Sequence, residues 1–435
     1  MTGYVRRALP VLLVLAAAGL VACGSDDSGS APAGEKGSTQ GAKVAPTLAE
    51  SKDATGSVTF CAGKDNSGGY HSAVERFNER YKGQGLSAKL IEFPNGSDEQ
   101  RQQAIQRLQA KSTDCDVYQS DVIWIAEFAQ QKWIMDLSDY VNRRKDEFIP
   151  STLEPNEYDG RYWAVPQVTG AGLLYRRTDQ VPDAPSTWQQ LYQEAEANDG
   201  FGYQGAPYEG LTCNFIEVSS ALGGSILSDD GKTATFDSPE NLKALKFMVD
   251  GVKDGAANKA VTTFMEEPAR LAFEAGKTTF MRNWSYAYAL DLKAKELKGK
   301  LAVSPLPSFE GGGKGGVLGG NGPVLSAFSK NPKGALLFID HLTSPDTLEL
   351  NMSKFSLPSV LNESYDAPAV KKAVPYAAEL KAAIESAVAR PVSPVYPQIS
   401  QAVYNNVNAA LAGQTSPEDA LKKGQQEIEQ ALTAF

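Results

Sequence analysis

The segment from residue 58 to residue 131 alternates short apolar runs with stretches of helical periodicity. The apolar runs cover residues 58–61, 86–93 and 116–120, and each has a length typical of a buried strand. The stretch after each run spaces its apolar residues as one face of a helix does. This strand–helix order predicts a parallel sheet with helices outside it, so we expect a fold of the α/β class.

The length of the chain predicts two compact lobes. Its 435 residues exceed what one hydrophobic core usually holds, and no internal repeat accounts for the excess. We place the first crossing between the lobes near residues 177–185, and we interpret residues 311–322, with eight glycines, as the return hinge. The predicted first lobe comprises residues 58–178 and 315–366, and the predicted second lobe comprises residues 179–314 and 367–435.

The first residues predict export from the cytoplasm. Two arginines precede an apolar run over residues 8–22, which is typical of a signal peptide and short for a membrane-spanning helix. The small residues before Cys23 resemble a bacterial lipobox. That resemblance implies a signal peptide over residues 1–22, a diacylglyceryl group on Cys23, and anchoring at the extracytoplasmic face of the cell membrane. Residues 23–57 are rich in Gly, Ser and Ala, and we expect them to form a flexible tether.

The charge and the cysteine pattern limit the partners. A net charge of −10 and a pI of about 5.0 argue against a nucleic-acid partner, which would require a basic surface. The four cysteines are scattered without a CxxC motif and there are two histidines, so no metal site or cofactor is predicted. If Cys23 carries a lipid, Cys61, Cys115 and Cys213 remain, and the sequence leaves open which two could form a disulfide.

Two aspartates follow predicted strands. Asp65 and Asp121 each lie just past the carboxyl end of an apolar run. Ligands of open α/β sheets bind at this edge, and a carboxylate there can accept hydrogen bonds from adjacent hydroxyl groups. The alternative interpretation is that each aspartate only caps a loop or a helix.

A tryptophan lies at another junction of a strand and a helix. Residues 277–281 read as a buried strand, and helical spacing resumes over residues 286–297, with Ser285 as a candidate N-cap. Trp284 therefore lies where a strand ends and free backbone N–H groups begin, which favours a ligand-binding role. The alternative is that Trp284 is a core residue, since tryptophan is highly buried on average.

Two common catalytic motifs are not matched by this chain. Residues 276–278 read Gly-Lys-Thr, but a P-loop needs a glycine where Leu271 stands, and no GxSxG motif is present. A glycoside-processing enzyme that uses Asp65 and Asp121 as its two carboxylates remains the main catalytic alternative. A surface adhesin or receptor that only binds is a second alternative.

Four segments carry a resemblance to a known family. Residues 98–110, 121–138, 272–284 and 336–346 resemble those of ABC-transporter extracellular solute-binding proteins of the maltose/trehalose-binding type, and the resemblance covers residues 58–435. It implies a two-lobe periplasmic-binding-protein-like fold of type II, in which each lobe is a sheet flanked by helices with a hinge between them. It also implies a monomer that captures a sugar by hinge closure, catalyses no reaction, and delivers the sugar to the transmembrane subunits of an ABC permease.

The resemblance also implies roles for single residues. Asp65 and Asp121 are similar to the hydroxyl-binding acids of the first lobe, and Trp284 to the stacking platform of the second. Arg390 is similar to an arginine that binds sugar hydroxyls, and Tyr396 to a further aromatic residue of the binding site.

The chain departs from the family pattern at one position. The Gly319–Gly320 pair resembles a backbone contact to the ligand, with Gly320 as the contact residue. Many relatives have an aromatic residue next, where this chain has Asn321. Because one stacking surface is therefore missing, the sequence does not identify the sugar.

The chemistry of these residue types agrees with a sugar ligand. A pyranose offers a C–H face to an aromatic ring and a rim of hydroxyl groups to charged hydrogen-bonding groups. Hydrogen bonds to ionised groups are roughly twice as strong as neutral ones. We therefore expect a lipid-anchored, sugar-binding subunit of an importer.

Overall fold

The computed structural model describes residues 39–311, 313 and 316–433. The chain divides into two units at Lys36, and the described residues belong to the second unit, Gly37–Phe435. The predicted signal peptide, the predicted lipidation site at Cys23 and the first part of the predicted tether lie outside the described residues. In the described part of the chain, no helix is long and apolar enough to pass through a lipid bilayer.

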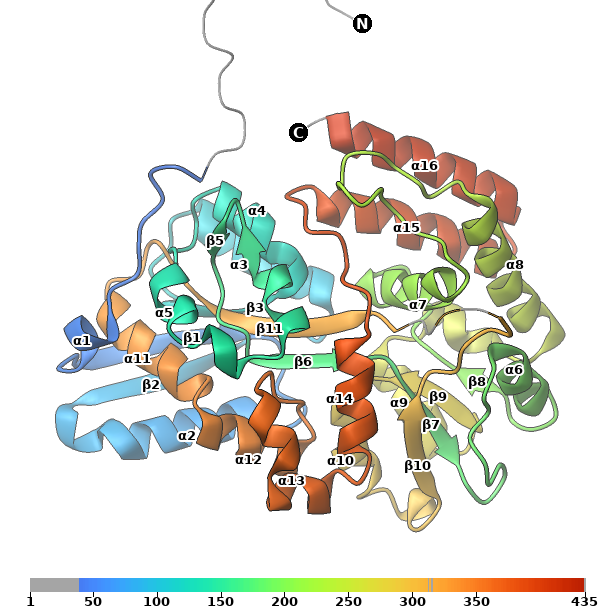
Figure 1. Cartoon of the computed structure of the whole chain (residues 1–435), viewed down its shortest axis with the longest axis horizontal. Coiled ribbons are helices and arrows are strands. Elements are labelled where there is room, and N and C mark those ends of the chain that lie inside the picture. The colour runs from blue at the N-terminus through green and yellow to red at the C-terminus, as the bar shows by residue number, and fades with distance from the viewer. Residues whose placement is uncertain (1–38, 312, 314–315, 434–435) are drawn as a thin grey trace, which may run out of the picture. The chain divides into compact units, whose positions relative to one another are not determined.

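Helices surround two main sheets (Figure 1). Short 3₁₀ turns, such as Val122–Trp124, connect several of the elements. The α-helices of the described residues are α1 (Leu48–Ser51), α2 (Gly69–Tyr81), α3 (Ser97–Gln109), α4 (Ile125–Gln130), α5 (Ser138–Asn142), α6 (Trp188–Glu196), α7 (Glu209–Ala221), α8 (Pro239–Asp254), α9 (Glu266–Glu274), α10 (Tyr286–Asp291), α11 (Pro332–Leu342), α12 (Pro345–Phe355), α13 (Pro368–Ala373), α14 (Ala377–Glu385), α15 (Tyr396–Leu411) and α16 (Pro417–Thr433).

The first sheet contains strands that lie far apart in the sequence. Its strands are β1 (Gly56–Ala62), β2 (Leu86–Glu92), β3 (Val117–Asp121), β6 (Val168–Ala171) and β11 (Leu318–Leu325). They lie in the order β2-β1-β3-β11-β6. β1 runs parallel to β2 and β3, which confirms the parallel arrangement predicted for the three apolar runs. β11 runs antiparallel to β3 and β6, so the sheet is mixed.

The second sheet is also mixed. Its strands are β7 (Leu173–Arg177), β8 (Phe201–Gly202), β9 (Phe280–Asn283) and β10 (Leu301–Pro305). They lie in the order β10-β7-β9-β8, and only β8 and β9 are parallel neighbours. A separate two-stranded sheet joins β4 (Glu157–Tyr158) to β5 (Arg161–Tyr162).

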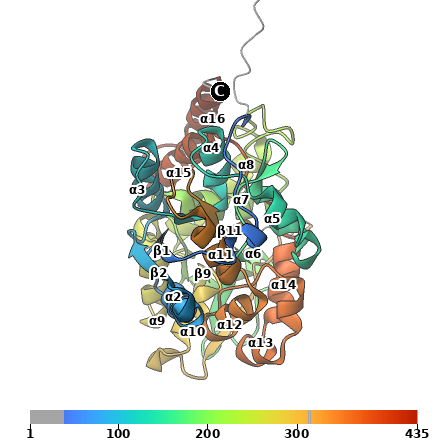
Figure 2. The same cartoon turned by 90° about the vertical axis from the view of Figure 1, so that its left-hand side faces the viewer.

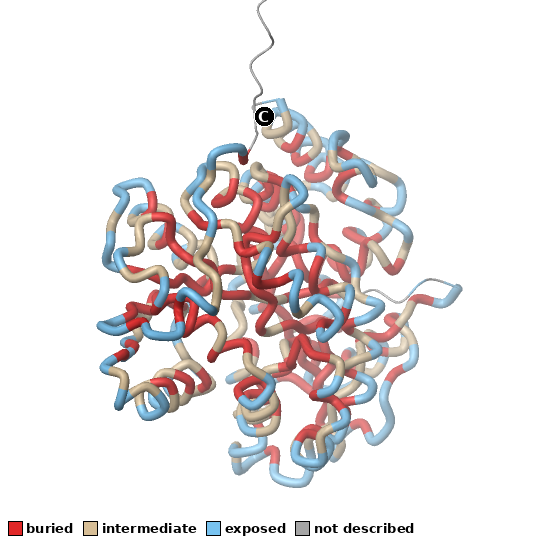
Figure 3. The backbone as a smooth tube through the Cα atoms, turned by 60° about the vertical axis from the view of Figure 1, so that its left-hand side comes forward, coloured by how far each residue is buried: buried red, intermediate tan, exposed pale blue. Residues whose placement is uncertain are grey.

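Both faces of the first sheet are covered by apolar side chains. Phe60 on β1 packs against Tyr70 of α2 and Phe338 of α11, with ring centroids 5.4 and 5.3 Å away. Successive strand residues point to opposite faces, so Cys61 joins the cluster on the other face, with Leu108 of α3. Figures 1 and 2 show α3 and α4 on one side of this sheet and α2 on the other. Figure 3 shows the buried residues gathered in the interior and most exposed residues on the outer turns of the tube.

The chain crosses from the first sheet to the second at Gly172. β6 ends at Ala171 in the first sheet and β7 begins at Leu173 in the second. The crossing therefore precedes the predicted region, residues 177–185, because the run GLLY belongs to the second sheet. A Cβ atom at Gly172 would lie 2.1 Å from Glu217 Oε1, so a glycine is needed here.

The predicted return hinge is partly a strand. β11 begins at Leu318, inside the predicted hinge over residues 311–322. Gly320 tolerates no side chain in this strand, since a Cβ atom there would lie 2.9 Å from the carbonyl oxygen of Val168. The glycines of this stretch thus partly reflect close strand packing, which composition alone does not distinguish from a hinge.

The second half of the predicted tether is ordered. The backbone N–H and the hydroxyl group of Thr39 donate to Asp159 Oδ2 at 2.9 and 2.6 Å. Val44 pairs with Asp136, and α1 begins with a capping box between Thr47 and Glu50. The expectation of a flexible tether over residues 23–57 is therefore wrong from Thr39 onward, because local caps and bonds to distant residues fix this segment.

One disulfide joins β1 to the segment that leads into β3. Cys61 of β1 is bonded to Cys115, which precedes β3, and both lie in the apolar cluster under α3 and α4. Cys213 of α7 is a buried free thiol. The structure thus gives the pairing that the sequence left open.

α3 and α10 begin without a side-chain cap, although Ser285 is the candidate N-cap of α10. Ser97 does not cap α3, because the N-cap is Gly96 and no side chain bonds the first turn. Ser285 makes no side-chain cap either, and Asn283 Oδ1 accepts the N–H of Trp284 at 2.8 Å instead.

Candidate functional site

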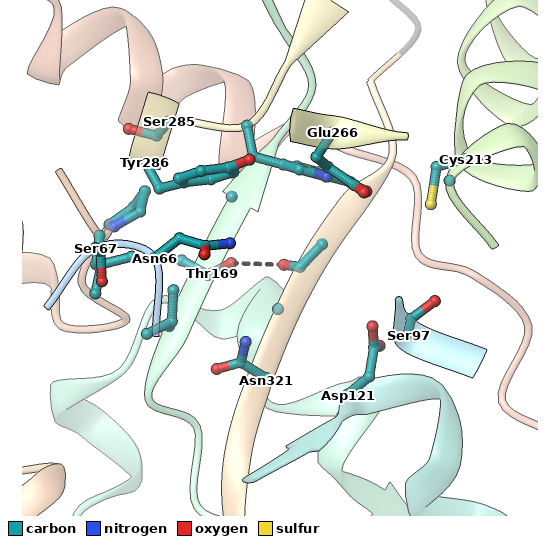
Figure 4. A pocket seen from close by; sticks show the side chains of 18 of the residues that line it. Asn66, Ser67, Ser97, Asp121, Thr169, Cys213, Glu266, Ser285, Tyr286 and Asn321 are labelled. Atoms are coloured by element: carbon teal, nitrogen blue, oxygen red, sulfur yellow. Dashed lines mark hydrogen bonds between the residues drawn. The ribbon is translucent and has the colours of Figure 1, made fainter. Parts of the chain in front are cut away.

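A cavity of about 280 Å³ lies between elements of the two sheets (Figure 4). The first sheet contributes Asp121 at the end of β3 and Gly320 and Asn321 of β11, and the elements of the second sheet contribute Glu209 and Trp284. We call this cavity the pocket. Its full lining is Lys64, Asp65, Asn66, Ser67, Tyr70, Ser97, Asp121, Val168, Thr169, Gly170, Glu209, Gly210, Cys213, Glu266, Trp284, Ser285, Tyr286, Gly319, Gly320, Asn321, Leu357, Pro358 and Arg390.

Six of the seven predicted site residues line the pocket. They are Asp65, Asp121, Trp284, Gly320, Asn321 and Arg390. Tyr396 does not line it, because its side chain is fully buried and its hydroxyl group donates to Glu209 Oε1 at 2.9 Å. The interpretation of Tyr396 as a pocket aromatic is therefore corrected to a supporting contact behind Glu209.

The carboxylate of Asp65 is occupied by the protein itself. Its Oδ1 atom accepts the hydroxyl of Ser67 at 3.0 Å and the N–H of Gly68 at 2.9 Å. Its Oδ2 atom accepts the N–H of His71 at 2.9 Å and lies 2.9 Å from His71 Nδ1. The side chain is 1% exposed. Asp65 thus fixes the loop that starts α2, as the capping alternative predicts, and has little remaining capacity to accept ligand hydroxyls.

Asp121 has a free acceptor beside the pocket. Its Oδ1 atom accepts Arg390 Nη2 at 2.9 Å and the N–H of Ile123 at 3.2 Å. The hydrogen bonds among the described residues leave its Oδ2 atom without a donor, and the side chain is 23% exposed. Figure 4 shows Asp121 facing the pocket close to Ser97. Asp121 can therefore accept hydrogen bonds from a bound polyol.

The indole ring of Trp284 packs against the guanidinium group of a buried arginine. The guanidinium carbon of Arg282 lies 4.0 Å from the centroid of the indole ring, a cation–π distance. Arg282 is fully buried, forms a bidentate pair with Glu217, and donates to Gln204 Oε1 at 3.0 Å. Burial lowers the pKa of Arg282, and the pairing with Glu217 acts in the opposite direction. The pKa ends above the ordinary value for arginine, so the side chain keeps its positive charge. With Arg282 stacked on it, the indole is fixed as a rigid platform in the pocket wall.

The side chain that follows the Gly319–Gly320 pair is a fixed amide. Asn321 Oδ1 accepts a hydrogen bond from Gln119 Nε2, and Gln119 also donates to Gln167 Oε1 at 2.9 Å. Figure 4 shows the Asn321 side chain on the floor of the pocket. The residue offers a polar group where a second ring would stack.

Two glutamates of the pocket were missed by the sequence analysis. Glu209 and Glu266 begin α7 and α9. Burial raises the pKa of Glu266, and contacts with Tyr208 and Trp284 partly oppose that shift. Burial also raises the pKa of Glu209, against the effect of Arg390. Acidic residues in a first helical turn are common for electrostatic reasons alone, so the sequence carries no signal that separates these two.

The cations of the pocket are few and already paired. Arg390 donates to Asp121 and Glu209, and Lys64 donates to Glu92 at 2.8 Å. No group of three His, Cys, Asp or Glu side chains that could hold a metal ion occurs among the described residues. The arrangement suits a neutral ligand with many hydroxyl groups better than an anion.

Comparison with known proteins identifies relatives that match most of the chain. Residues 63–349 match the family described as bacterial extracellular solute-binding protein. A probable ABC transporter-binding protein of Deinococcus radiodurans is 36% identical over 360 residues, which cover 78% of this chain and 85% of that protein.

Solved structures of the same kind share the fold. Maltose-bound MalE3 of T. maritima is 34% identical with a TM-score of 0.81, covering 86% of this chain and 99% of that one. A solute-binding protein of Thermotoga lettingae with bound α-D-tagatose is 24% identical with a TM-score of 0.80, covering 87% and 100%. These likenesses confirm the predicted two-lobe periplasmic-binding-protein-like fold. The chain belongs to the extracellular solute-binding proteins of bacterial ABC transporters.

Proposed function

We propose that this protein binds a di- or oligosaccharide of the maltose or trehalose type and delivers it unaltered to an ABC permease. The observation that carries the proposal is the pairing, in one pocket, of the Trp284 platform with the free acceptor oxygen of Asp121. One surface suits the C–H face of a pyranose and the other its hydroxyl rim. The maltose-bound relative from T. maritima, 34% identical, supports the same class of ligand.

Hinge closure provides the mechanism. We assign the two lobes to the two sheets, which moves the predicted first boundary to Gly172. A sugar that contacts Asp121 on one lobe and Trp284 on the other binds the closed state more tightly than the open state. It therefore shifts the population toward closure by its differential affinity.

We further propose that the protein acts as a monomer attached to the cell membrane by a lipid on Cys23. The ordered segment from Thr39 contacts the end of β11 and the turn between β4 and β5, where Lys43 Nζ donates to the carbonyl oxygen of Ala327 and Thr39 donates to Asp159. A tether ending there would attach the first lobe to the membrane and leave the second lobe free to move.

The occupied carboxylate of Asp65 supports binding without catalysis. A glycosidase needs one carboxyl group to transfer a proton and a second to act as nucleophile or base. Asp65 is bonded through one oxygen to Gly68 of its own loop and through the other to His71 of α2, so the predicted pair Asp65 and Asp121 lacks one working member.

A thermal-shift panel of mono- and disaccharides tests the proposal. A ligand at 100 times its dissociation constant should add about 2.7 kcal/mol to the free energy of unfolding. We expect such a shift with maltose or trehalose and no products by chromatography after prolonged incubation. No shift with any sugar would refute the proposed ligand class, and sugar cleavage would refute the absence of catalysis.

A further inference from the structure

Two carboxylates from different lobes converge on one guanidinium group. Arg390 Nη2 donates to Asp121 Oδ1 at 2.9 Å, and Arg390 Nη1 donates to Glu209 Oε1 at 2.8 Å. Asp121 ends β3 in the first sheet. Glu209 begins α7, which packs in the core of the second sheet through Leu211 and Phe215. The three side chains therefore form a contact between the lobes that consists of protein groups alone.

The Glu209 end of this connection is built into the second lobe. The Glu209 carboxylate also accepts the hydroxyl groups of Tyr396, at 2.9 Å, and of Ser400 on α15. The side chains of Glu209 and Arg390 are 5% and 3% exposed. A buried carboxylate with this many donors fixes the position of the guanidinium group.

The contact between Arg390 and Asp121 is the one that would break when the lobes open. Asp121 is 23% exposed and has one side-chain partner among the described residues, Arg390. Opening the lobes would break this single charge-assisted contact and leave the Glu209–Arg390 pair intact. Without Arg390, Asp121 and Glu209 would face each other as like charges, which favours separation.

We propose that Arg390 is a clasp that holds the ligand-free protein partly closed, with Glu209 as the residue that positions it. The clasp acts before any sugar binds, so it does not depend on the identity of the ligand. A sugar then stabilises a closed state that the protein already samples. Because the clasp occupies one oxygen of Asp121 and leaves the other free, closure and hydroxyl binding use different atoms of one side chain.

Cys213 provides a native reporter of opening. It lines the pocket next to Glu209, with Sγ 3.8 Å from Glu209 Oε1, and it is 2% exposed. Figure 4 shows Cys213 and Asp121 on the same side of the pocket, each from its own element. Cys61 and Cys115 are joined in a disulfide and do not react with a thiol reagent. The labelling rate of Cys213 is therefore obtained by subtracting the signal of a Cys213→Ser chain from that of the unchanged protein.

The experiment measures the rate at which Cys213 of the full chain is labelled in the absence of sugar. Asp121→Asn removes the ion pair between the lobes and keeps Arg390 on Glu209. We expect labelling to become about tenfold faster, the change that one charge-assisted hydrogen bond produces. The matched control is Asp139→Asn, which breaks an exposed pair with Arg143 within one helix and should leave the rate unchanged.

Further variants separate the clasp from a general loss of stability. Arg390→Gln should accelerate labelling more than Asp121→Asn, and Glu209→Gln should accelerate it while the thermal midpoint stays above the assay temperature. If Arg390→Gln fails to fold, the labelling rate of Asp121→Asn alone tests the clasp. This variant should fold, because Asp121 is partly exposed and its replacement leaves no buried charge unpaired in the first lobe. Labelling of Asp121→Asn at the wild-type rate would overturn the clasp. It would leave the proposed sugar binding untouched, because no sugar is present.

Discussion

Gly319 is the position where a single methyl group should weaken sugar binding without harming the fold. A Cβ atom at this residue would lie 2.7 Å from Trp284 Cζ3 and 2.9 Å from Cη2, closer than carbon atoms pack. The backbone at Gly319 has little freedom to move, because it is paired with Gly170 of β6 and β11 is joined to β3 from Asn321 onward. The indole has little freedom either, since Arg282 is stacked on it.

The cost of Gly319→Ala should fall on the closed state. Overpacking of this kind typically costs about 1–3 kcal/mol. Gly319 belongs to the first sheet and Trp284 to the second, so opening the lobes relieves the contact. We therefore expect the dissociation constant for maltose or trehalose to rise about 5- to 150-fold. The thermal midpoint of the ligand-free protein should change little.

Calorimetric titration of both proteins with the tighter-binding sugar measures this effect. Gly316→Ala is the matched control, because a Cβ atom there would meet only the Cβ atom of Ala171, at an ordinary 3.8 Å. Unchanged affinity in Gly319→Ala would refute the close approach of the lobes at Trp284. An equal loss of stability with and without sugar would show that the methyl group damages the fold instead.

Three further predictions concern the platform, a buried acid and the disulfide. Trp284→Ala should weaken sugar binding by about 10- to 150-fold, the value of one buried aromatic side chain, while circular dichroism stays native. Burial and the charge of Glu274 raise the pKa of Asp291 to about 8, against the opposing effect of Arg270. The folded state therefore keeps a proton that the unfolded state releases near pH 4, so the free energy of unfolding should fall as pH rises from about 4 to 8. Asp291→Asn should flatten this slope in denaturant titrations, and an unchanged slope would exclude Asp291 as its origin. Replacing both bridged cysteines by serine should cost about 4 kcal/mol, as expected for a closed loop with a sequence separation of 54, and a loss below 1 kcal/mol would contradict this model.

The sequence predicted the features that depend on local patterns. The alternation of apolar runs and helical stretches gave the parallel part of the first sheet, since each strand and helix is recognisable by its own period. The position of Asp121 at a strand end and of Trp284 at a strand–helix junction placed both residues at the ligand-binding edge of the sheets. These predictions needed no knowledge of distant contacts.

The features that the sequence did not predict depend on contacts between distant residues. The occupied carboxylate of Asp65 follows from the fold of its own loop, which a strand-end position does not specify. The order of the segment from Thr39 depends on Asp159, which lies 120 residues away in the chain. Glu209 meets its partner Arg390, 181 residues later in the chain, only in the folded protein, and both side chains line the pocket.

Isothermal titration calorimetry of the full chain with maltose and with trehalose tests the central claim most directly. The claim is that one pocket between two lobes holds a neutral sugar and releases it unaltered. It predicts saturable one-to-one binding to at least one of the two sugars, with the heat signal returning to baseline after every injection. No binding of either sugar, or a sustained heat flow that indicates turnover, would contradict it.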